Sequence, residues 1–351
     1  MAAKQEIERA LEHHTLNTQD GSTLSYYSIG RGPGLLILHG AMNYALGSLE
    51  LAELLADNYT VYLLSRRGRG QSGPYPKSIT DLEPLLKATG SKDKKNGREF
   101  IMTIADKTYQ RTYDPAFTSA VLSTELADQN LVVKATSAEY ILGISSGAIL
   151  TMEACLSAPS SLPEFHSTVE KVVIFEPPLQ FSDVDTGVDM NGVRRYEDSM
   201  AKDDVSGALV DAMKTVQLGP GWIPRSVMKV LTNLMLWGQG RKSKDGKADE
   251  EDRGKTGFGD FAPLLRYDFA LAEYAVGAAE RFEGVMAERK VLLLSGEKSP
   301  SYIGIGMGKL QRVLEGTESI KLEGVGHEVL CNAKMRGSPA KAVGALKKFL
   351  G

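Results

Sequence analysis

Residues 139–153 read EYILGISSGAILTME, an apolar segment that passes through Gly143-Ile144-Ser145-Ser146-Gly147 into residues that favour helices. A strand, a tight turn and a helix in this order would present Ser145 at the top of the turn, with glycines where neighbouring backbone passes too closely for a Cβ atom. The N-terminus of the helix would also direct backbone N–H groups towards an anion beside that serine. The stretch therefore predicts a nucleophilic Ser145; the alternative is that both serines only cap the helix.

A serine hydroxyl reacts near neutral pH only when a base takes its proton. His327 lies far downstream in LEGVGHEVL, after a strand-like segment and before the last helical pattern. Of the five histidines, it is the one that fits the chain order serine, acid, histidine of a strand–turn–helix nucleophile. His327 is therefore the predicted base; the alternative is a loop histidine without a partner.

A third motif, His39-Gly40-Ala41-Met42, follows the apolar run GLLILHG. At the end of a strand beside the serine turn, the N–H of Ala41 would join the N–H of Ser146 as an oxyanion hole. The alternative is an ordinary turn that ends a strand.

The rest of the chain alternates short apolar runs with amphipathic segments. Apolar runs without polar alternation are typical of strands in a sheet that helices cover on both faces, and they occupy residues 22–30, 34–40, 59–65, 138–144, 171–176 and 290–296. Helical patterns occupy residues 48–58, 124–134 and 339–350. This alternation predicts an α/β protein with a doubly wound, mostly parallel sheet.

Two stretches break the alternation. Residues 84–116 hold a polar run and then FIMTIADKTYQRTY, which predicts an insertion, either a hairpin or an irregular excursion. Residues 180–288 lack a clear strand and show helical patterns at about 204–217, 222–238 and 260–281, with a charged, solvated loop at 238–257. We therefore divide the chain into a core, 1–179 and 289–351, and a helical cap, 180–288.

The composition and charge of the chain limit the kinds of partner that we expect. The 351 residues include 41 basic and 44 acidic side chains, a net charge of −3, and no long basic stripe, so neither nucleic acid nor a membrane is an expected partner. The N-terminus lacks the apolar core of a signal peptide, and no apolar run reaches 18 residues. Two cysteines, Cys155 and Cys331, fit free thiols in a reducing compartment. We expect a soluble, cytoplasmic protein of undetermined oligomeric state.

The motifs LLILHGA, SRRGRGQSG, GISSGA, VVIFEPP and GVGHEV, in this order, make the chain resemble the α/β-hydrolase superfamily from about residue 15 onwards. Within it, the chain looks most like small bacterial and fungal hydrolases of the serine type. The resemblance implies an α/β-hydrolase fold with a helical cap inserted after the strand at 171–176. It also implies a serine rather than a carboxylate nucleophile, which argues against epoxide hydrolase and haloalkane dehalogenase chemistry.

The acid departs from the usual pattern of that superfamily. Its usual aspartate, three residues after the glycine of KVLLLSG, is replaced by Ser299, which cannot orient a histidine by charge. Glu176 in VVIFEPPL occupies the position that a minority of the superfamily uses, including some lactone-cleaving enzymes, and is our predicted acid. The alternative for Glu176 is an ion pair with Arg66 or Arg67, and Glu297 is the reserve acid.

Three arginines and four apolar residues have a structural as well as a functional interpretation. Arg66, Arg67 and Arg69 stand beside glycines but lack the pattern of a phosphate loop, so we expect them to tie loops together. Four apolar residues could line a pocket under the cap, although at helical spacing such residues are more often core: Tyr44, Trp222, Met235 and Trp237.

The expected reaction is hydrolysis of an ester or lactone in a small to medium apolar molecule, for example in secondary metabolism or detoxification. Ser145, His327 and Glu176 would form the triad, and no metal or organic cofactor is implied. Two alternatives stay open. One is another reaction on the same residues: acyl transfer to an amine or alcohol, C–C bond hydrolysis, elimination or cyclisation. The other is a ligand-binding protein without catalysis.

Overall fold

The computed structural model describes residues 10–82, 84–86, 101–218, 222–245 and 257–351. Its strands are β1 Glu12–Asn17, β2 Thr23–Gly30, β3 Gly34–Leu38, β4 Thr60–Ser65, β5 Ile101–Ile104, β6 Lys107–Gln110, β7 Tyr140–Ile144, β8 Lys171–Phe175, β9 Lys290–Gly296 and β10 Glu318–Leu322. Its helices are η1 Ala45–Ser48, α1 Leu49–Leu55, α2 Lys77–Thr80, α3 Pro115–Thr136, α4 Ser146–Leu156, α5 Pro163–Thr168, α6 Gly192–Met200, α7 Val205–Thr215, α8 Arg225–Asp245, η3 Phe258–Leu264, α9 Leu265–Tyr274, η4 Ala279–Met286, α10 Ser301–Val313, η5 Ala333–Met335 and α11 Ala340–Leu350.

Eight strands form one twisted sheet in the order β1-β2-β4-β3-β7-β8-β9-β10. Only β2 runs antiparallel to its neighbours, so the predicted doubly wound, mostly parallel sheet is confirmed. All six apolar runs singled out in the sequence are strands of this sheet. The sequence did not predict β1, because its residues EHHTLN are polar and mostly exposed at the sheet edge.

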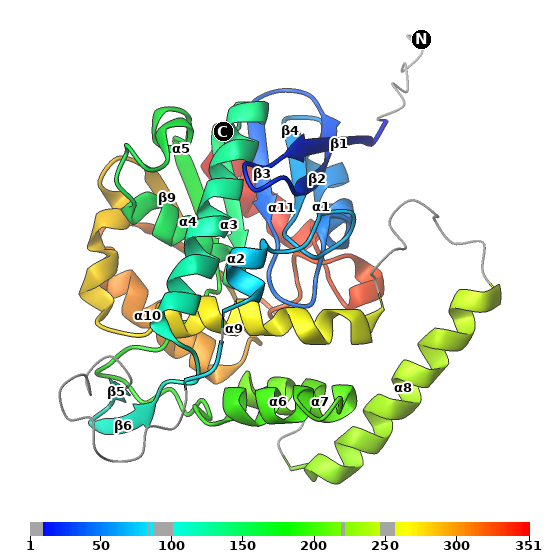
Figure 1. The fold of residues 1–351 in the computed structure, drawn as a ribbon. Helices are drawn as coiled ribbons and strands as arrows, with labels where there is room; N and C mark the ends of the chain where they lie inside the picture. The colour runs from blue at the N-terminus through cyan, green and yellow to red at the C-terminus, as the bar shows by residue number, and fades with distance from the viewer. Residues whose placement is uncertain (1–9, 83, 87–100, 219–221, 246–256) are drawn as a thin grey trace.

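Helices cover both faces of the sheet (Figure 1). On one face, α1 and α11 pack their buried leucines against β3 and β9. On the other face, α3, α4 and α10 share a larger apolar core with the helices that follow β8. This arrangement explains the continuous apolar strands, since helices shield both faces of the central strands β3, β7 and β8 from water.

The segment between β8 and β9 is helical, as the sequence predicted, and its helices gather at one end of the molecule (Figure 1). Two details differ from the prediction. An additional helix, α6, precedes the first predicted one, and α8 continues to Asp245, through residues 238–245 that were predicted to be loop. Residues 246–256 of the predicted loop lie outside the described residues.

The insertion at 84–116 contains a hairpin, one of the two forms predicted. Strands β5 and β6 pair in antiparallel register around Ala105 and Asp106, whose φ angles of 46° and 62° match a two-residue turn. The insertion ends earlier than predicted because Asp114 caps α3 and Pro115 begins it, nine residues before the predicted helical pattern. Its polar run at 90–99 lies outside the described residues.

A buried ionic network joins the core to the helices above it. Arg66 and Arg69, in the turn after β4, are at most 1% exposed. The guanidinium of Arg66 binds Glu125 of α3 through two hydrogen bonds of 3.0 and 2.7 Å, and its Nη1 donates to Asp268 of α9 at 2.8 Å. Arg69 donates to the other oxygen of Asp268 at 2.5 Å. These arginines therefore tie loops and helices together, as expected, rather than line a phosphate site.

The charges in this network stabilise one another. Burial alone would raise the pKa of Asp268, but the guanidinium groups of Arg69 and Arg66 hold that pKa below its usual value. Glu125 behaves in the same way, because Arg66 outweighs the effect of burial on its pKa. Both carboxylates are therefore ionised, and each arginine needs its partner to offset the loss of water.

We predict that Asp268→Ala lowers the free energy of unfolding by about 3–5 kcal/mol, because it leaves two buried guanidinium groups short of an acceptor. Glu318→Ala is the matched control, since Glu318 pairs with Lys348 on the surface and its loss should change stability by less than about 1 kcal/mol. Urea unfolding followed by circular dichroism measures both. Equal effects of the two substitutions would contradict the role given to the network.

Candidate active site

Ser145 occupies the sharp turn between β7 and α4 that the sequence predicts. Its φ and ψ angles of 55° and −119° are unusual for a residue with a side chain. The turn is held because the N–H of Ser145 donates to the carbonyl oxygen of Phe175, on the neighbouring strand β8, at 2.8 Å. Such backbone strain persists only where the surroundings enforce it, and it is concentrated at functional sites.

Glycines flank this serine because the backbone packs too tightly for side chains. A Cβ atom on Gly147 would lie 2.3 Å from the carbonyl oxygen of Leu38 at the end of β3. A Cβ atom on Gly143 would lie 2.4 Å from the hydroxyl of Thr151. The two glycines therefore allow α4 to begin directly against the sheet, with Ser145 between them.

Glu176 and His327 are in direct contact. The Nδ1 atom of His327 lies 2.6 Å from Oε2 of Glu176, and the other carboxylate oxygen accepts a hydrogen bond of 2.6 Å from the N–H of Gly296. Glu176 is completely buried and follows β8 with a φ of 48°. Its ion pair with Arg66 or Arg67, the alternative considered from the sequence, does not form, because those arginines bind other carboxylates.

The reserve acid, Glu297, lies elsewhere. Its side chain is exposed, and it accepts a hydrogen bond of 2.8 Å from the N–H of Gly324, at the start of the histidine loop. Ser299, at the usual position of the acid, has a buried hydroxyl without a hydrogen-bond partner among the described residues. Of the two predicted acids, the structure thus brings only Glu176 to His327.

The loop after β3 holds the predicted oxyanion donor. His39 anchors this loop, because its Nε2 accepts from the backbone N–H of Arg66 at 3.1 Å and its Nδ1 lies 2.8 Å from the carbonyl oxygen of Gly40. Burial lowers the pKa of His39 well below its usual value, so the ring is neutral and suits both bonds. Ala41 and Met42 follow, and Met42 also has a positive φ, of 55°.

Ser145, His327, Ala41 and Ser146 all line one cavity of about 160 Å³. Ser145 and His327 both line this cavity, so the serine and the histidine held by Glu176 share one space. Ser146 donates its hydroxyl to Asp268 at 2.7 Å, and its backbone N–H lies in the first turn of α4, where helical N–H groups have no acceptor within the helix. The opposite wall is apolar and comes mainly from the helices after β8: Leu209, Met213, Val216, Leu265 and Phe269.

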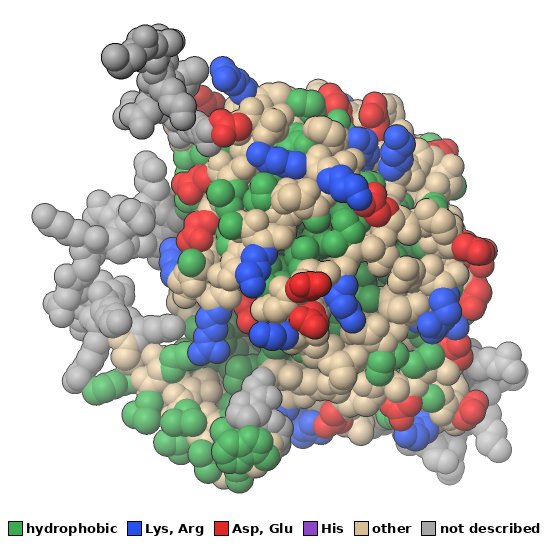
Figure 2. All heavy atoms as spheres, turned by 180° about the vertical axis from the view of Figure 1, so that it is seen from behind, with side chains coloured by type: hydrophobic (Ala, Val, Ile, Leu, Met, Phe, Trp, Pro, Cys, Tyr) green, Lys and Arg blue, Asp and Glu red, His purple; other side chains and the backbone are tan. Residues whose placement is uncertain are grey.

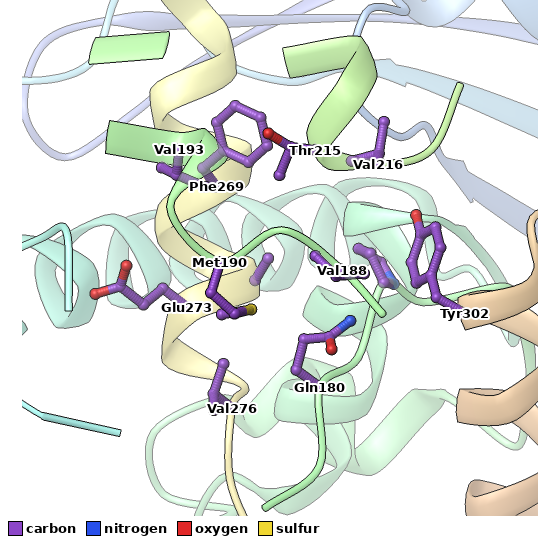
Figure 3. Close-up of a pocket in the computed structure, with 12 residues that line it drawn as sticks. Gln180, Val188, Met190, Val193, Thr215, Val216, Phe269, Glu273, Val276 and Tyr302 are labelled. Carbon is purple, nitrogen blue, oxygen red and sulfur yellow. The ribbon is translucent and has the colours of Figure 1, made fainter. Parts of the chain in front are cut away.

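A second, smaller cavity of about 60 Å³ adjoins the first. Figure 3 shows its lining, which includes Val188, Met190, Val193, Phe269 and Val276. Five residues line both cavities and so form the wall between them: Pro178, Val216, Phe269, Ala272 and Tyr302. The sequence missed this second space, because its residues come from segments without a motif.

The four apolar residues that the sequence offered as pocket candidates line neither cavity. Trp222, Met235 and Trp237 are exposed, by 83%, 40% and 59%, which corrects both interpretations given to them, pocket and core. Tyr44 packs against Phe261 instead. Within the described residues, no three His, Cys, Asp or Glu side chains lie close enough together to hold a metal ion.

No protein-family model matches the chain. Among solved structures, it is similar to an alpha/beta hydrolase from Sphaerobacter thermophilus DSM 20745, with 21% identity, a TM-score of 0.64 and coverage of 96% of this chain and 100% of that one. It is also similar to naproxen esterase from Bacillus subtilis, with 16% identity, a TM-score of 0.51 and coverage of 98% and 93%. An epoxide hydrolase from Vigna radiata matches at 15% identity and a TM-score of 0.52, with coverage of 97% and 99%. The chain therefore has the α/β-hydrolase fold, which these proteins use for different reactions.

We predict that Gly147→Ala lowers the free energy of unfolding by about 1–3 kcal/mol, because the new methyl group meets the backbone of β3. Gly344→Ala is the matched control: Gly344 lies in α11 with open space around its Cβ position, so alanine should stabilise the helix by about 0.5–1 kcal/mol. Thermal and urea unfolding measure both. If Gly147→Ala leaves the free energy of unfolding unchanged, the turn can accommodate a methyl group and the proposed backbone clash is wrong.

Proposed function

We propose that this protein with the α/β-hydrolase fold is a serine hydrolase that cleaves an ester or lactone of a small to medium apolar molecule. The observation that carries the proposal is the contact of 2.6 Å between His327 Nδ1 and Glu176 Oε2, on the same cavity as the strained Ser145. A base oriented by a buried carboxylate beside a serine is the arrangement that activates a hydroxyl nucleophile.

In the proposed reaction, Oγ of Ser145 attacks the substrate carbonyl carbon while Nε2 of His327 takes the hydroxyl proton. Glu176 accepts the hydrogen bond from Nδ1, which keeps the other nitrogen free as a base and stabilises the imidazolium that forms. The N–H groups of Ala41 and Ser146 hold the oxyanion. His327 then protonates the leaving oxygen, and a water molecule, activated by the same histidine, releases the acid from Ser145.

The position of the acid suits this mechanism although it is unusual in the fold. Glu176 receives one hydrogen bond from Gly296 and one from His327, so both carboxylate oxygens are satisfied without a nearby arginine. The carboxylate therefore remains available to balance the charge of protonated His327. A carboxylate at this place orients the base as an acid after β9 would, because the ends of β8 and β9 are adjacent.

The cavities support an apolar substrate of limited size. Their walls are mostly aliphatic and aromatic, and the one carboxylate in the main cavity, Asp268, is neutralised by Arg66 and Arg69. An acyl or alkyl group gains free energy there by leaving water, at about 0.8 kcal/mol for each buried CH₂ group. The small second cavity shares five lining residues with the main one and would take an extension of the substrate.

We predict that the wild type hydrolyses short-chain p-nitrophenyl esters and that Ser145→Ala abolishes turnover. Glu176→Gln should lower kcat by about 10⁴-fold, because an amide no longer favours the productive tautomer of His327. Glu297→Gln is the matched control and should change kcat little, since Glu297 is exposed and bonds only the loop backbone. Release of p-nitrophenol measures all four proteins.

A fluorophosphonate probe completes this test, because it reacts with activated serines whatever the substrate. If the probe labels the wild type but not Ser145→Ala, and no ester is turned over, Ser145 is an activated nucleophile and the reaction is acyl transfer or C–C cleavage instead of ester hydrolysis. Folded wild type that neither labels nor turns over would refute hydrolysis and favour ligand binding. Loss of activity in Glu297→Gln but not in Glu176→Gln would overturn the assignment of the acid.

We predict that Val216→Ala extends the range of accepted acyl chains, because Val216 stands in the wall between the two cavities. Each further CH₂ group accommodated should raise kcat/KM for longer p-nitrophenyl esters, relative to the acetate, by about fourfold, the equivalent of 0.8 kcal/mol. Val205→Ala is the control, since Val205 begins α7, the helix that Val216 follows, and lines neither cavity. The same chain-length profile in both variants would contradict a role of the second cavity in binding substrate.

A further inference from the structure

The second cavity is mainly apolar but is not lined by apolar residues alone. Four polar side chains contribute to its lining: Gln180, Thr215, Glu273 and Tyr302. Tyr302, near the start of α10, also lines the main cavity that holds Ser145 and His327. A few polar groups in a mostly apolar pocket orient a ligand and distinguish it from similar molecules. The hydrogen-bonding state of these four side chains therefore indicates which ligand the cavity fits.

Thr215 and Glu273 use their polar atoms within the protein. The hydroxyl of Thr215 donates to a backbone carbonyl oxygen one turn earlier in α7, at 2.7 Å. The carboxylate of Glu273 accepts hydrogen bonds of 3.0 and 3.1 Å from two backbone N–H groups of the segment before α3. Figure 3 shows this carboxylate directed away from Gln180 and Tyr302. Thr215 and Glu273 thus serve the packing of the helices, and recognition of a ligand falls to the other two side chains.

Tyr302 and Gln180 each carry a buried donor without an acceptor. Tyr302 is 4% exposed, and its hydroxyl makes no hydrogen bond with the described residues. Gln180 is 6% exposed; its Oε1 accepts a hydrogen bond from the hydroxyl of Thr186, but its Nε2 has no partner in the described part of the chain. A buried donor without an acceptor is costly, and folded proteins pair nearly all such groups. Both donors border a cavity, where a ligand can supply the acceptor.

We propose that Tyr302 and Gln180 form a polar subsite, in which they donate hydrogen bonds to a neutral carbonyl oxygen in the extension of the substrate. This inference rests on the proposed function and narrows its substrate class to esters or lactones that carry a second carbonyl group. A carbonyl oxygen has two lone pairs and no hydrogen, so it accepts from one donor or from both. The carbonyl that is cleaved lies at Ser145 in the main cavity, and the second one lies where the two cavities share Tyr302.

The two donors are in place before a ligand arrives. Burial raises the pKa of Tyr302, and the negative charge of Glu176 raises that pKa further, so the phenol stays protonated and can donate. Gln180 is fixed through its main chain and its side chain, because its carbonyl oxygen accepts from the N–H of Gly277 at 3.2 Å and its Oε1 binds Thr186. Donors that are already ordered lose little conformational entropy when they bind.

The charges around the cavities favour a neutral oxygen over an anionic one. In the described part of the chain, no lysine or arginine lines either cavity. Figure 2 shows lysine and arginine side chains on the outer surface instead, among aspartates and glutamates. An anionic group in the polar subsite would lose its water and meet the charge of Glu176 without a cation to balance it. A ketone oxygen loses less on leaving water and still accepts both hydrogen bonds.

Calorimetric titration of Ser145→Ala tests the polar subsite without turnover. The ligands are p-nitrophenyl oxoalkanoates with the ketone at successive carbons from the fourth to the seventh, each compared with the alkanoate of the same chain length. We expect one ketone position to bind about tenfold more tightly than its plain counterpart, the usual effect of neutral hydrogen bonds. Adding Tyr302→Phe should remove most of this preference, and adding Gln180→Met should reduce it. Tyr26→Phe is the matched control and should keep it, since Tyr26 is 7% exposed and lines neither cavity.

Urea unfolding of Tyr302→Phe separates recognition from a structural role. Because the hydroxyl of Tyr302 has no partner among the described residues, its removal should not lower the free energy of unfolding, whereas loss of a structural hydrogen bond would. Failure of the oxoalkanoates to bind, equal binding of both ester classes, or a preference that survives Tyr302→Phe overturns the polar subsite.

Turnover of the same ester pairs by the wild type reports the proposed function separately. Hydrolysis without any preference for a ketone would refute the polar subsite and leave the proposed reaction intact. A ketone preference in binding, lost in Tyr302→Phe, without hydrolysis by the wild type would support the polar subsite and refute the proposed reaction.

Discussion

The buried guanidinium groups of Arg66 and Arg69 impose the constraint on which much of this structure depends. A buried charge is tolerated only when its partners replace the water that it lost. Here the partners come from different parts of the chain: Glu125 from α3 and Asp268 from α9. The same Asp268 accepts a hydrogen bond from the hydroxyl of Ser146, directly after the candidate nucleophile. The hydrogen bonds from Arg66 and Arg69 to Asp268 thus hold α9 beside the turn that carries Ser145.

The end of the parallel sheet concentrates backbone strain where the candidate site lies. Met42, Ser145 and Glu176 follow the neighbouring strands β3, β7 and β8, and all three have positive φ angles. The register of the strands makes this possible, because the N–H of Ser145 is held by the carbonyl of Phe175, the residue before Glu176. The strained turn at Ser145 is therefore held by a hydrogen bond to the residue before Glu176, so Ser145 and Glu176 cannot be positioned independently.

The helices between β8 and β9 have two different faces. The inward residues of α7 and α9 close the main cavity with apolar side chains, while α8 directs its apolar residues away from the core. A hydrophobic pattern alone does not distinguish these cases, since both faces follow helical spacing. The difference arises from the stripe of Met228, Thr232 and Leu236, which attaches α8 by the side opposite its exposed leucines.

The sequence by itself determined most strands of the sheet and pointed to Ser145 and His327, because these depend on local patterns: apolar runs, glycines around a serine, and chain order. It did not decide between Glu176 and Glu297, because that choice depends on which carboxylate approaches the histidine across adjacent strand ends. Tertiary structure alone brought Glu176 to 2.6 Å from His327 and left Glu297 exposed. It likewise decided that Trp222 and Trp237 face solvent, since burial depends on how a helix is rotated against its neighbours and not on the residue type.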